Sequence, residues 1–374
     1  MNRVVHRVKT MLIVFLILGS TLLQSGCGFK DIDKRLFVMA IGIDASEKQE
    51  DMYKVTLKIA LPSGSLKEAS GDMYTYLTQE STKVTDAIRM LKTHVDKEFD
   101  FGHLKTIVIG EKLLSHDISN IIDSFLRRRD FQRISWLAAG RPTAEKVLKT
   151  EPKSEMAASV ALFNIFSDTG VDTPYAIDTY IFDIRRRMLE NGIDPVIPVI
   201  ETDEENTRFM VNKSIILKDH VAELQLSHRK TKLLNILRNE LDKLELFIEK
   251  DGSEYMISVD DANTKFKVLT GNKIPVIKVN IDMAGIVEES DRSIEPKRLD
   301  ILSKHTSDEV GEWIKELLVE FQENKLDPVG FGLRYRATRL NHKDLFKEWE
   351  DELYPNAKFD VNVNIGIKST GVIE

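Results

Sequence analysis

The sequence predicts an α+β (mixed α/β) protein of several domains, with mixed and antiparallel sheets covered by helices. In the first half, apolar runs of strand length alternate with segments of helical spacing. In the second half, two long segments alternate strictly between apolar and polar residues. The length of 374 residues allows two or three domains, because one domain usually holds about 150 residues.

Strands are expected early in the first half. Residues 36–44 (LFVMAIGID) form an apolar run typical of a buried strand, and every second residue of 53–61 is apolar, which predicts a half-buried strand. The sequence PSGS at 62–65 then predicts a turn. Further strands are expected at 104–110 (LKTIVIG) and at 131–138.

Helices are expected between and after these strands. Ser81 can cap a helix whose apolar residues recur at helical spacing from 84 to 95, and another helix is expected at 118–126. More helical stretches follow at 143–149, 154–167 and 175–190. The first half is therefore expected to be an α/β layer with a helical annex.

The main domain boundary is expected near residue 203. Pro195 and Pro198 precede an acidic stretch at 201–205 (ETDEE), which favours a linker because proline cannot continue a helix and the charges resist burial. We therefore divide the chain into a signal peptide at 1–26, an N-terminal α/β region at 27–203 with further subdivision, and a C-terminal α/β domain at 204–374.

The second half contains the clearest strand patterns. Residues 277–283 and 359–367 each alternate apolar and polar residues, as a strand with one face in solvent does. The pattern predicts an antiparallel sheet covered on its other face, and a helix with apolar residues between 310 and 321 is the expected cover.

The N-terminus has the three parts of a signal peptide. Residues 1–9 are basic, residues 11–23 are apolar, and Ser25 and Gly26 precede Cys27. The apolar run is shorter than the roughly 20 residues that a membrane-spanning helix needs. Cys27 is the only cysteine, and small residues before a cysteine are typical of a bacterial lipoprotein, in which the thiol accepts a diacylglycerol.

The expected location is therefore the outer face of the cell membrane, where a lipid on Cys27 holds a folded ectodomain. One position departs from the usual lipoprotein pattern, since Gln24 stands where Leu, Val or Ile is common. An uncleaved N-terminal anchor and simple secretion are the alternatives, and both also place the ectodomain outside.

The sequence contains no signature of catalysis or of cofactor binding. A single cysteine excludes an intramolecular disulfide and cysteine-rich metal sites. The chain has no Gly-x-Ser-x-Gly, no Walker sequence, and eight histidines without metal-binding spacing. We therefore expect no enzyme and no catalytic, cofactor-binding or metal-binding residues, although carboxylates remote in sequence could still form a pair.

The distribution of charge along the chain indicates which classes of partner it can bind. The formal net charge is −7, and removing residues 1–26, which carry three bases and no acid, makes the ectodomain more acidic. An acidic ectodomain argues against nucleic acid as a partner. The arginine triplets 127–129 and 185–187 lie near the ends of expected helices, where solvated cations favour the helix dipole. A binding patch for lipid headgroups or an acidic partner is the alternative.

Several segments together resemble the Ger(x)C family of spore germination lipoproteins. They occur in the family's order over essentially the whole mature chain: Gly26-Cys27, IGID at 41–44, residues 103–140, LDPVGFG at 326–332, WEDELYP at 349–355 and the closing strand at 361–370. Gly28-Phe29 stands where the family commonly has Trp-Asp. The resemblance implies the C subunit of a nutrient germinant receptor in the spore inner membrane, with two polytopic subunits (A and B type) as partners and no known catalytic residues.

We expect a scaffold or coupling role, in which the lipid anchor concentrates the ectodomain near its membrane partners. The alternative is a lipid-anchored solute-binding protein with nutrient in an interdomain cleft, and a surface hydrolase is a third possibility. Within LDPVGFG, Asp327-Pro328 should start a turn, and Gly330 and Gly332 should permit tight backbone geometry. Phe331 should either pack inward or face a partner, and it is the candidate partner surface.

Overall fold

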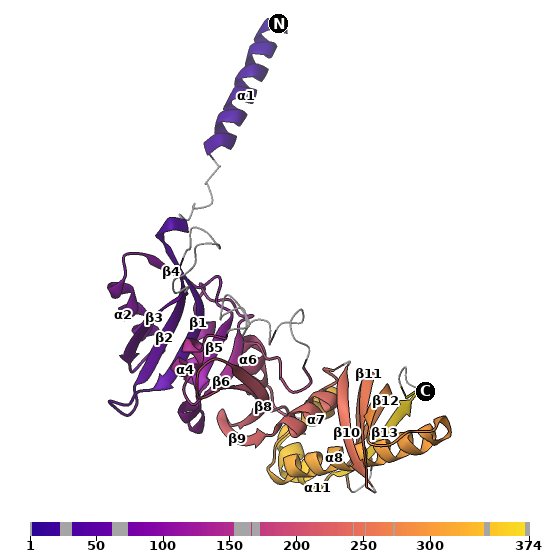
Figure 1. Ribbon diagram of the computed structural model, residues 1–374. Helices are drawn as coiled ribbons and strands as arrows, with labels where there is room; N and C mark the ends of the chain where they lie inside the picture. Colours follow the sequence, from indigo (N-terminus) through magenta and orange to yellow (C-terminus); the bar gives the residue numbers. More distant parts are fainter. Residues whose placement is uncertain are drawn as a thin grey trace.

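Two β-sheets organise the chain. The computed structural model describes residues 2–22, 32–61, 74–152, 166, 173–241, 243–250, 252–271, 274–339 and 345–370. The first sheet takes its strands from the first two thirds of the chain, and the second sheet from the remainder (Figure 1). The expected α+β class with several layers is confirmed.

The first sheet is mixed. Its strands lie in the order β3-β2-β1-β5-β6-β7-β8-β9, and β4 (Glu98–Asp100) pairs with the start of β1. The parallel centre contains β1 (Arg35–Ala45), β5 (Thr106–Gly110), β6 (Trp136–Arg141) and β7 (Val196–Thr202). Antiparallel strands flank it on both sides: β2 (Tyr53–Ala60), β3 (Tyr74–Ser81), β8 (Phe209–Lys218) and β9 (Val221–Leu226).

Helices cover both faces of this sheet. Apolar residues of α2 (Val84–Leu91), α3 (Ser119–Leu126) and α6 (Ile181–Leu189) share one core, and those of α4 (Ala144–Lys149) belong to a core on the other face. β2 is consequently buried on both faces, so the expectation of a half-buried strand is wrong. Lys58, on its polar side, is only 1% exposed, and its Nζ donates a hydrogen bond to the carbonyl of Leu148 at 2.9 Å.

Other expected elements shift at their ends. The strand expected at 131–138 begins at Trp136, and the helix expected at 175–190 begins at Ile181. The residue that precedes α2 is Lys83 rather than Ser81, although the Ser81 hydroxyl donates to Asp86 at 2.8 Å. The turn at 62–65 and, apart from residue 166, the helix at 154–167 lie outside the described residues.

The second sheet has the order β10-β11-β12-β13. The strands β10 (Leu244–Lys250), β11 (Ser253–Leu269) and β12 (Val276–Ser290) are antiparallel, whereas β13 (Lys358–Ile367) runs parallel to β12. The expected all-antiparallel sheet is therefore wrong at its last pair, because the long connection that contains α8 (Leu299–Glu323) returns the chain to the same end. The expected cover is confirmed, since apolar residues of α8 pack in the core beneath this sheet.

The boundary expected at residue 203 falls in the turn between β7 and β8, and the first sheet continues beyond it to Leu226. The acidic stretch forms a tight turn, in which Asp203 Oδ1 accepts from the backbone N–H of Thr207 at 2.6 Å and of Arg208 at 3.1 Å. β7, β8 and β9 also contribute residues to the core of the second sheet, as does α7 (His228–Arg238). The division into domains stays a prediction.

The remaining elements of the described chain are short, apart from the 21-residue helix α1. They are the 3-10 helices η1 (Ile32–Lys34), η2 (Lys92–His94), η3 (Glu111–Ser115) and η4 (Pro296–Arg298), the helices α1 (Asn2–Leu22), α9 (Phe331–Ala337), α10 (Leu345–Glu348) and α11 (Tyr354–Asn356), and the π-helical turn η5 (Trp349–Leu353). Within the described ranges, no helix combines the length and apolar character needed to cross a membrane.

Candidate functional site

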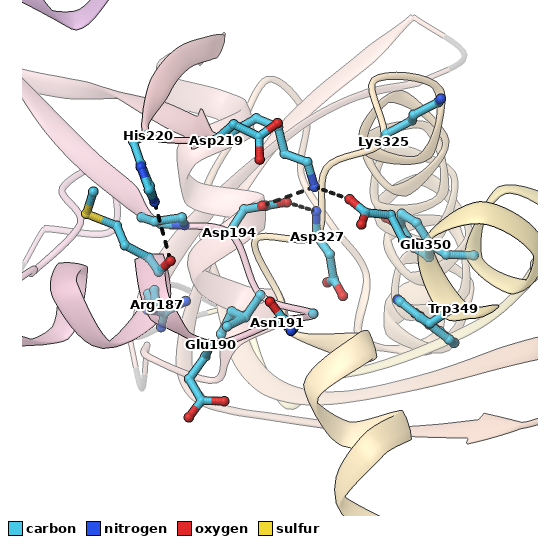
Figure 2. A pocket seen from close by; sticks show the side chains of 16 residues that line it. Arg187, Glu190, Asn191, Asp194, Asp219, His220, Lys325, Asp327, Trp349 and Glu350 are labelled. Atoms are coloured by element: carbon cyan, nitrogen blue, oxygen red, sulfur yellow. Dashed lines mark hydrogen bonds and ion pairs between the residues drawn. The ribbon is translucent and has the colours of Figure 1, made fainter. Parts of the chain in front are cut away.

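A polar cavity of about 130 Å³ lies where the two halves of the chain meet. The first half supplies the connection from α6 to β7 and the β8–β9 turn, and the second half supplies the segment after α8 and the turn η5. In Figure 2, Asp194 and Asp327 lie at the centre, with His220 and Arg187 on one side and Glu350 and Trp349 on the other.

Asp194 and Asp327 join the two halves through two hydrogen bonds, one between their backbones and one to the Asp194 side chain. The N–H of Asp194 donates to the carbonyl of Asp327 at 2.9 Å, and the N–H of Asp327 donates to Asp194 Oδ2 at 2.5 Å. Both residues are buried. Because breaking these bonds would leave buried polar groups unpaired, the reciprocal pair stabilises the contact between the halves.

The Asp327 side chain also organises the start of α9. Its Oδ1 accepts from the N–H of Gly330 at 2.7 Å and of Phe331 at 3.0 Å, and its Oδ2 accepts from the N–H of Gly332 at 2.7 Å. The carboxylate thereby satisfies three N–H groups that a helix start leaves without an acceptor. Asp327 therefore fixes both the turn and its attachment to the first half.

Burial makes the Asp327 carboxyl group a weaker acid than an ordinary aspartate. Desolvation raises the pKa of Asp327 to about 7, against the opposing effect of the three N–H donors, and the nearby charge of Asp194 raises it further. Burial also raises the pKa of Asp194, although the Lys218 ammonium acts in the opposite direction. The two acids therefore hold protons at a higher pH than ordinary aspartates do.

Lys218 supplies the counter-charge from β8. Its Nζ lies 2.9 Å from Glu350 Oε1 and 3.5 Å from Asp194 Oδ1. Burial alone would lower the pKa of Lys218, but the carboxylates of Asp194 and Glu350 raise it above its usual value. Lys218 thus connects the first sheet to both the junction acid and the turn η5.

Two glycines let the backbones of the two halves touch. Gly192 has a φ of +85°, and a Cβ on it would lie 2.5 Å from the carbonyl carbon of Gly332. A Cβ on Gly332 would lie 2.5 Å from Trp349 Nε1 and 2.8 Å from Gly192 Cα. The Gly192 carbonyl accepts from the N–H of Leu333 at 2.8 Å. Neither position has room for a side chain.

Phe331 points into the core of the second half. It is fully buried, and its ring centroid lies 4.9 Å from that of Phe266 and 6.3 Å from that of Phe359. The inward-packing expectation therefore describes this side chain, and its role as a partner surface stays a prediction. Cys27 lies outside the described residues, so its lipidation stays a prediction.

Sequence reasoning missed most of the junction. It quoted Asp327, Gly330 and Gly332 as turn residues, but gave no role to Gly192, Asp194, Lys218 or Glu350. Arg187, expected to be solvated, is buried and pairs with Asp183 at 2.7 Å. Across the described ranges, no group of three or more His, Cys, Asp or Glu residues is arranged to hold a metal ion.

Comparison with known proteins identifies the family. The model of the spore germination protein N-terminal domain matches residues 28–202, and that of the spore germination B3/GerAC-like C-terminal domain matches residues 212–371. The chain belongs to this GerAC-like spore germination family. The Ger(x)C resemblance is thereby confirmed.

Individual relatives cover nearly the whole chain. Spore germination protein KC of Bacillus subtilis is 24% identical, over 98% of this chain and 97% of its own. The putative spore germination protein YfkR of the same organism is 22% identical, over 94% of each. The crystal structure of the GerBC protein has the same fold, with a TM-score of 0.59 and 19% identity over 87% of this chain and 96% of that one.

The pKa of Asp327 predicts how stability depends on pH. Its pKa is about 7 in the folded protein and about 3.8 when unfolded, so the folded state binds the proton more tightly. The contribution of this group is full below pH 4 and is lost as the pH rises to 7, at most about 4 kcal/mol. We expect denaturant titrations at pH 5 and pH 8 to show more than half of this loss in the wild type and a smaller one in Asp327→Asn.

Other carboxyl groups have a lowered pKa, and their effect on stability changes with pH in the opposite direction. The informative quantity is therefore the difference in pH dependence between wild type and variant. Asp327→Asn should also be less stable at pH 5, because an amide cannot accept hydrogen bonds at both of its terminal atoms. An Asp130→Asn variant, at an acid whose pKa is lowered, is the matched control and should leave the difference between pH 5 and pH 8 unchanged, because that carboxylate is ionised in both the folded and the unfolded state above pH 5. Identical pH dependence in wild type and Asp327→Asn would contradict the assignment.

Proposed function

We propose that this chain is the lipid-anchored, non-catalytic C-type subunit of a nutrient germinant receptor, and that it scaffolds or couples the receptor's membrane subunits during spore germination. The observation that carries the proposal is the match to both family domains in order along the chain. The relatives' names describe spore germination proteins, and their similarity extends over nearly their full length.

The geometry of the junction supports coupling over solute capture. Small-molecule pockets usually measure about 300–1,000 Å³, whereas the junction cavity measures about 130 Å³. The polar groups of this cavity bind one another across the junction, since Asp327 bonds to Asp194 and Glu350 pairs with Lys218. A contact built in this way holds the two halves in a fixed orientation, as a scaffold between membrane partners requires.

The proposed partners are two polytopic membrane subunits, of A and B type, together with the lipid of the spore inner membrane. Photo-crosslinking from the ectodomain in intact spores tests this directly. We expect adducts with the masses of the polytopic subunits, and these adducts should disappear in spores that lack those subunits. If crosslinking gives no adduct that contains a polytopic subunit, the scaffold role is contradicted.

Lipidation predicts a specific result for Cys27→Ala. Because the chain has one cysteine, the variant has no other thiol to modify, and metabolic labelling with a palmitate analogue should be lost. Retention in the membrane fraction should fall as well. Ser25→Ala keeps a small residue before the cysteine and serves as the control that remains labelled. Unchanged labelling of Cys27→Ala would remove the lipid anchor from the proposal.

A further inference from the structure

A second hollow lies away from the junction, beside the outer edge of β10. Its volume is about 430 Å³, and we call it the β10 groove. The residues that define it come from the segment before α6, from α7, from β10 and from α8: Tyr175, His228, Arg229, Lys232, Phe247 and Trp313. Figure 1 shows α7 beside the β10 edge of the second sheet.

Two cations of α7 enter the groove and have no carboxylate partner among the described residues. The Arg229 guanidinium lies 3.7 Å from the centroid of the Trp313 ring, and Lys232 Nζ donates to the Glu245 carbonyl at 2.5 Å. In the part of the chain that the structure describes, no carboxylate oxygen lies within 4.0 Å of either cation. Lys230, between them in sequence, is paired with Glu320.

Lys232 is the deeper of the two cations. It is only 8% exposed, and burial lowers its pKa, as does the positive charge of Arg229. A ligand carboxylate placed between Arg229 and Lys232 would offset both effects, because a guanidinium and an ammonium each donate charge-assisted hydrogen bonds to carboxylate oxygens.

The groove also contains acids, and they limit the charge of an occupant. Glu309 accepts a hydrogen bond from Trp313 Nε1 at 3.1 Å, and Glu249 lies exposed at the rim. Glu245 is close enough to Lys232 to raise its pKa. Further acidic groups on an occupant would meet these carboxylates, so the groove suits a single negative charge.

The backbone of β10 forms one wall of the groove. β10 is the first strand of the sheet and pairs only with β11 among the described strands. The Glu245 carbonyl faces off the sheet, toward Lys232, and outward-facing residues alternate along an antiparallel edge strand. The backbone groups of Phe247 and Glu249 therefore also face outward, and the Phe247 side chain is 50% exposed.

We propose that the β10 groove binds an extended peptide segment of a partner protein, which pairs with the outer edge of β10 and places one Glu or Asp side chain between Arg229 and Lys232. Strand addition supplies main-chain hydrogen bonds, and the cations and aromatic rings supply selectivity for the acidic side chain. The inference goes beyond the germination role and depends only on the chemistry of this groove.

Binding of defined peptides to the full-length chain in detergent tests the proposal. The probe is acetyl-Thr-Val-Glu-Val-Thr-amide labelled with a fluorophore and followed by anisotropy. A peptide with Gln in place of Glu should bind about tenfold more weakly, since it loses the charge-assisted bonds. A peptide with Pro in place of both Val residues lacks the N–H groups needed for pairing and should show a similar loss.

Protein variants locate the site. Arg229→Gln should weaken binding of the Glu peptide about tenfold, whereas Lys230→Gln, whose cation already has a partner, should stay within about twofold of wild type. Arg229 is exposed, so its variant should keep the wild-type circular dichroism spectrum and melting temperature. Lys232→Met is a second variant that removes the deeper cation.

Three results would overturn the proposal. Equal affinity for the Glu and Gln peptides would remove the carboxylate site, and equal affinity for the Val and Pro peptides would remove the strand pairing. If glutarate binds with dependence on Arg229 while no peptide binds, the groove takes a small anion and is no docking surface for a protein. Each readout is independent of germination, so failure here leaves the receptor role untouched.

Discussion

Replacing Phe331 by alanine should lower the free energy of unfolding by about 3–5 kcal/mol, the usual cost of truncating a buried phenylalanine. The side chain is fully buried between Phe266 and Phe359, so its removal leaves a cavity beneath the second sheet. Equilibrium denaturation of the purified protein measures the loss. In spores, germination should fall only in proportion to the amount of protein that remains.

Phe182→Ala is the matched control, because the same truncation at a side chain that is 43% exposed should cost much less. If Phe331→Ala keeps its stability and abundance while nutrient-triggered germination falls, the side chain acts on a partner after all, and its buried position is not the functional one. Normal stability together with normal germination would leave the LDPVGFG segment without a role.

A methyl group at Gly332 should destabilise the junction by about 3 kcal/mol, at the upper end of the range for overpacking. The added Cβ would lie 2.5 Å from Trp349 Nε1 and 2.8 Å from Gly192 Cα, and one of these atoms belongs to rigid backbone. We therefore expect Gly332→Ala to lower the melting temperature strongly. Gly271→Ala, at a position with open space around its Cβ, should have little effect.

The double variant Gly192→Ala/Gly332→Ala separates a junction effect from a local one. Both methyl groups enter the same contact between the halves, so the second should cost less once the first has opened it. If the double variant loses as much free energy of unfolding as the two single variants together, the two glycines do not share one contact.

Periodicity predicted the elements that are covered on one face. The strands β12 and β13 and the helix α8 each have one apolar side, and all three form where the sequence pattern predicts them. The pattern does not reveal strand direction, so the parallel pairing of β12 with β13 was missed. It also misled at β2, because Lys58 is polar in sequence but is enclosed by α4 in space.

The junction could not be predicted for a different reason. Asp194 and Asp327 lie 133 residues apart, and the bonds between them exist only when both halves have folded. Acidic residues are ordinarily expected at the surface, and nothing in the sequence around Asp194 or Asp327 indicated that these two are buried. The glycines of LDPVGFG gave a signal for tight backbone geometry, but not for the partner Gly192 that requires it.

The parallel closing strand has a consequence for the order of synthesis. The first sheet is complete once Leu226 has been made, whereas β12 must wait for β13, whose residues are among the last of the chain. Until then, one edge of β12 is unpaired and α8 lacks part of the apolar surface on which it packs. Exposed strand edges and apolar helix faces are what chaperones and proteases bind in unfinished proteins. A chain that terminates before Lys358 is therefore marked for degradation by its own surface, even though it contains every strand of the first sheet.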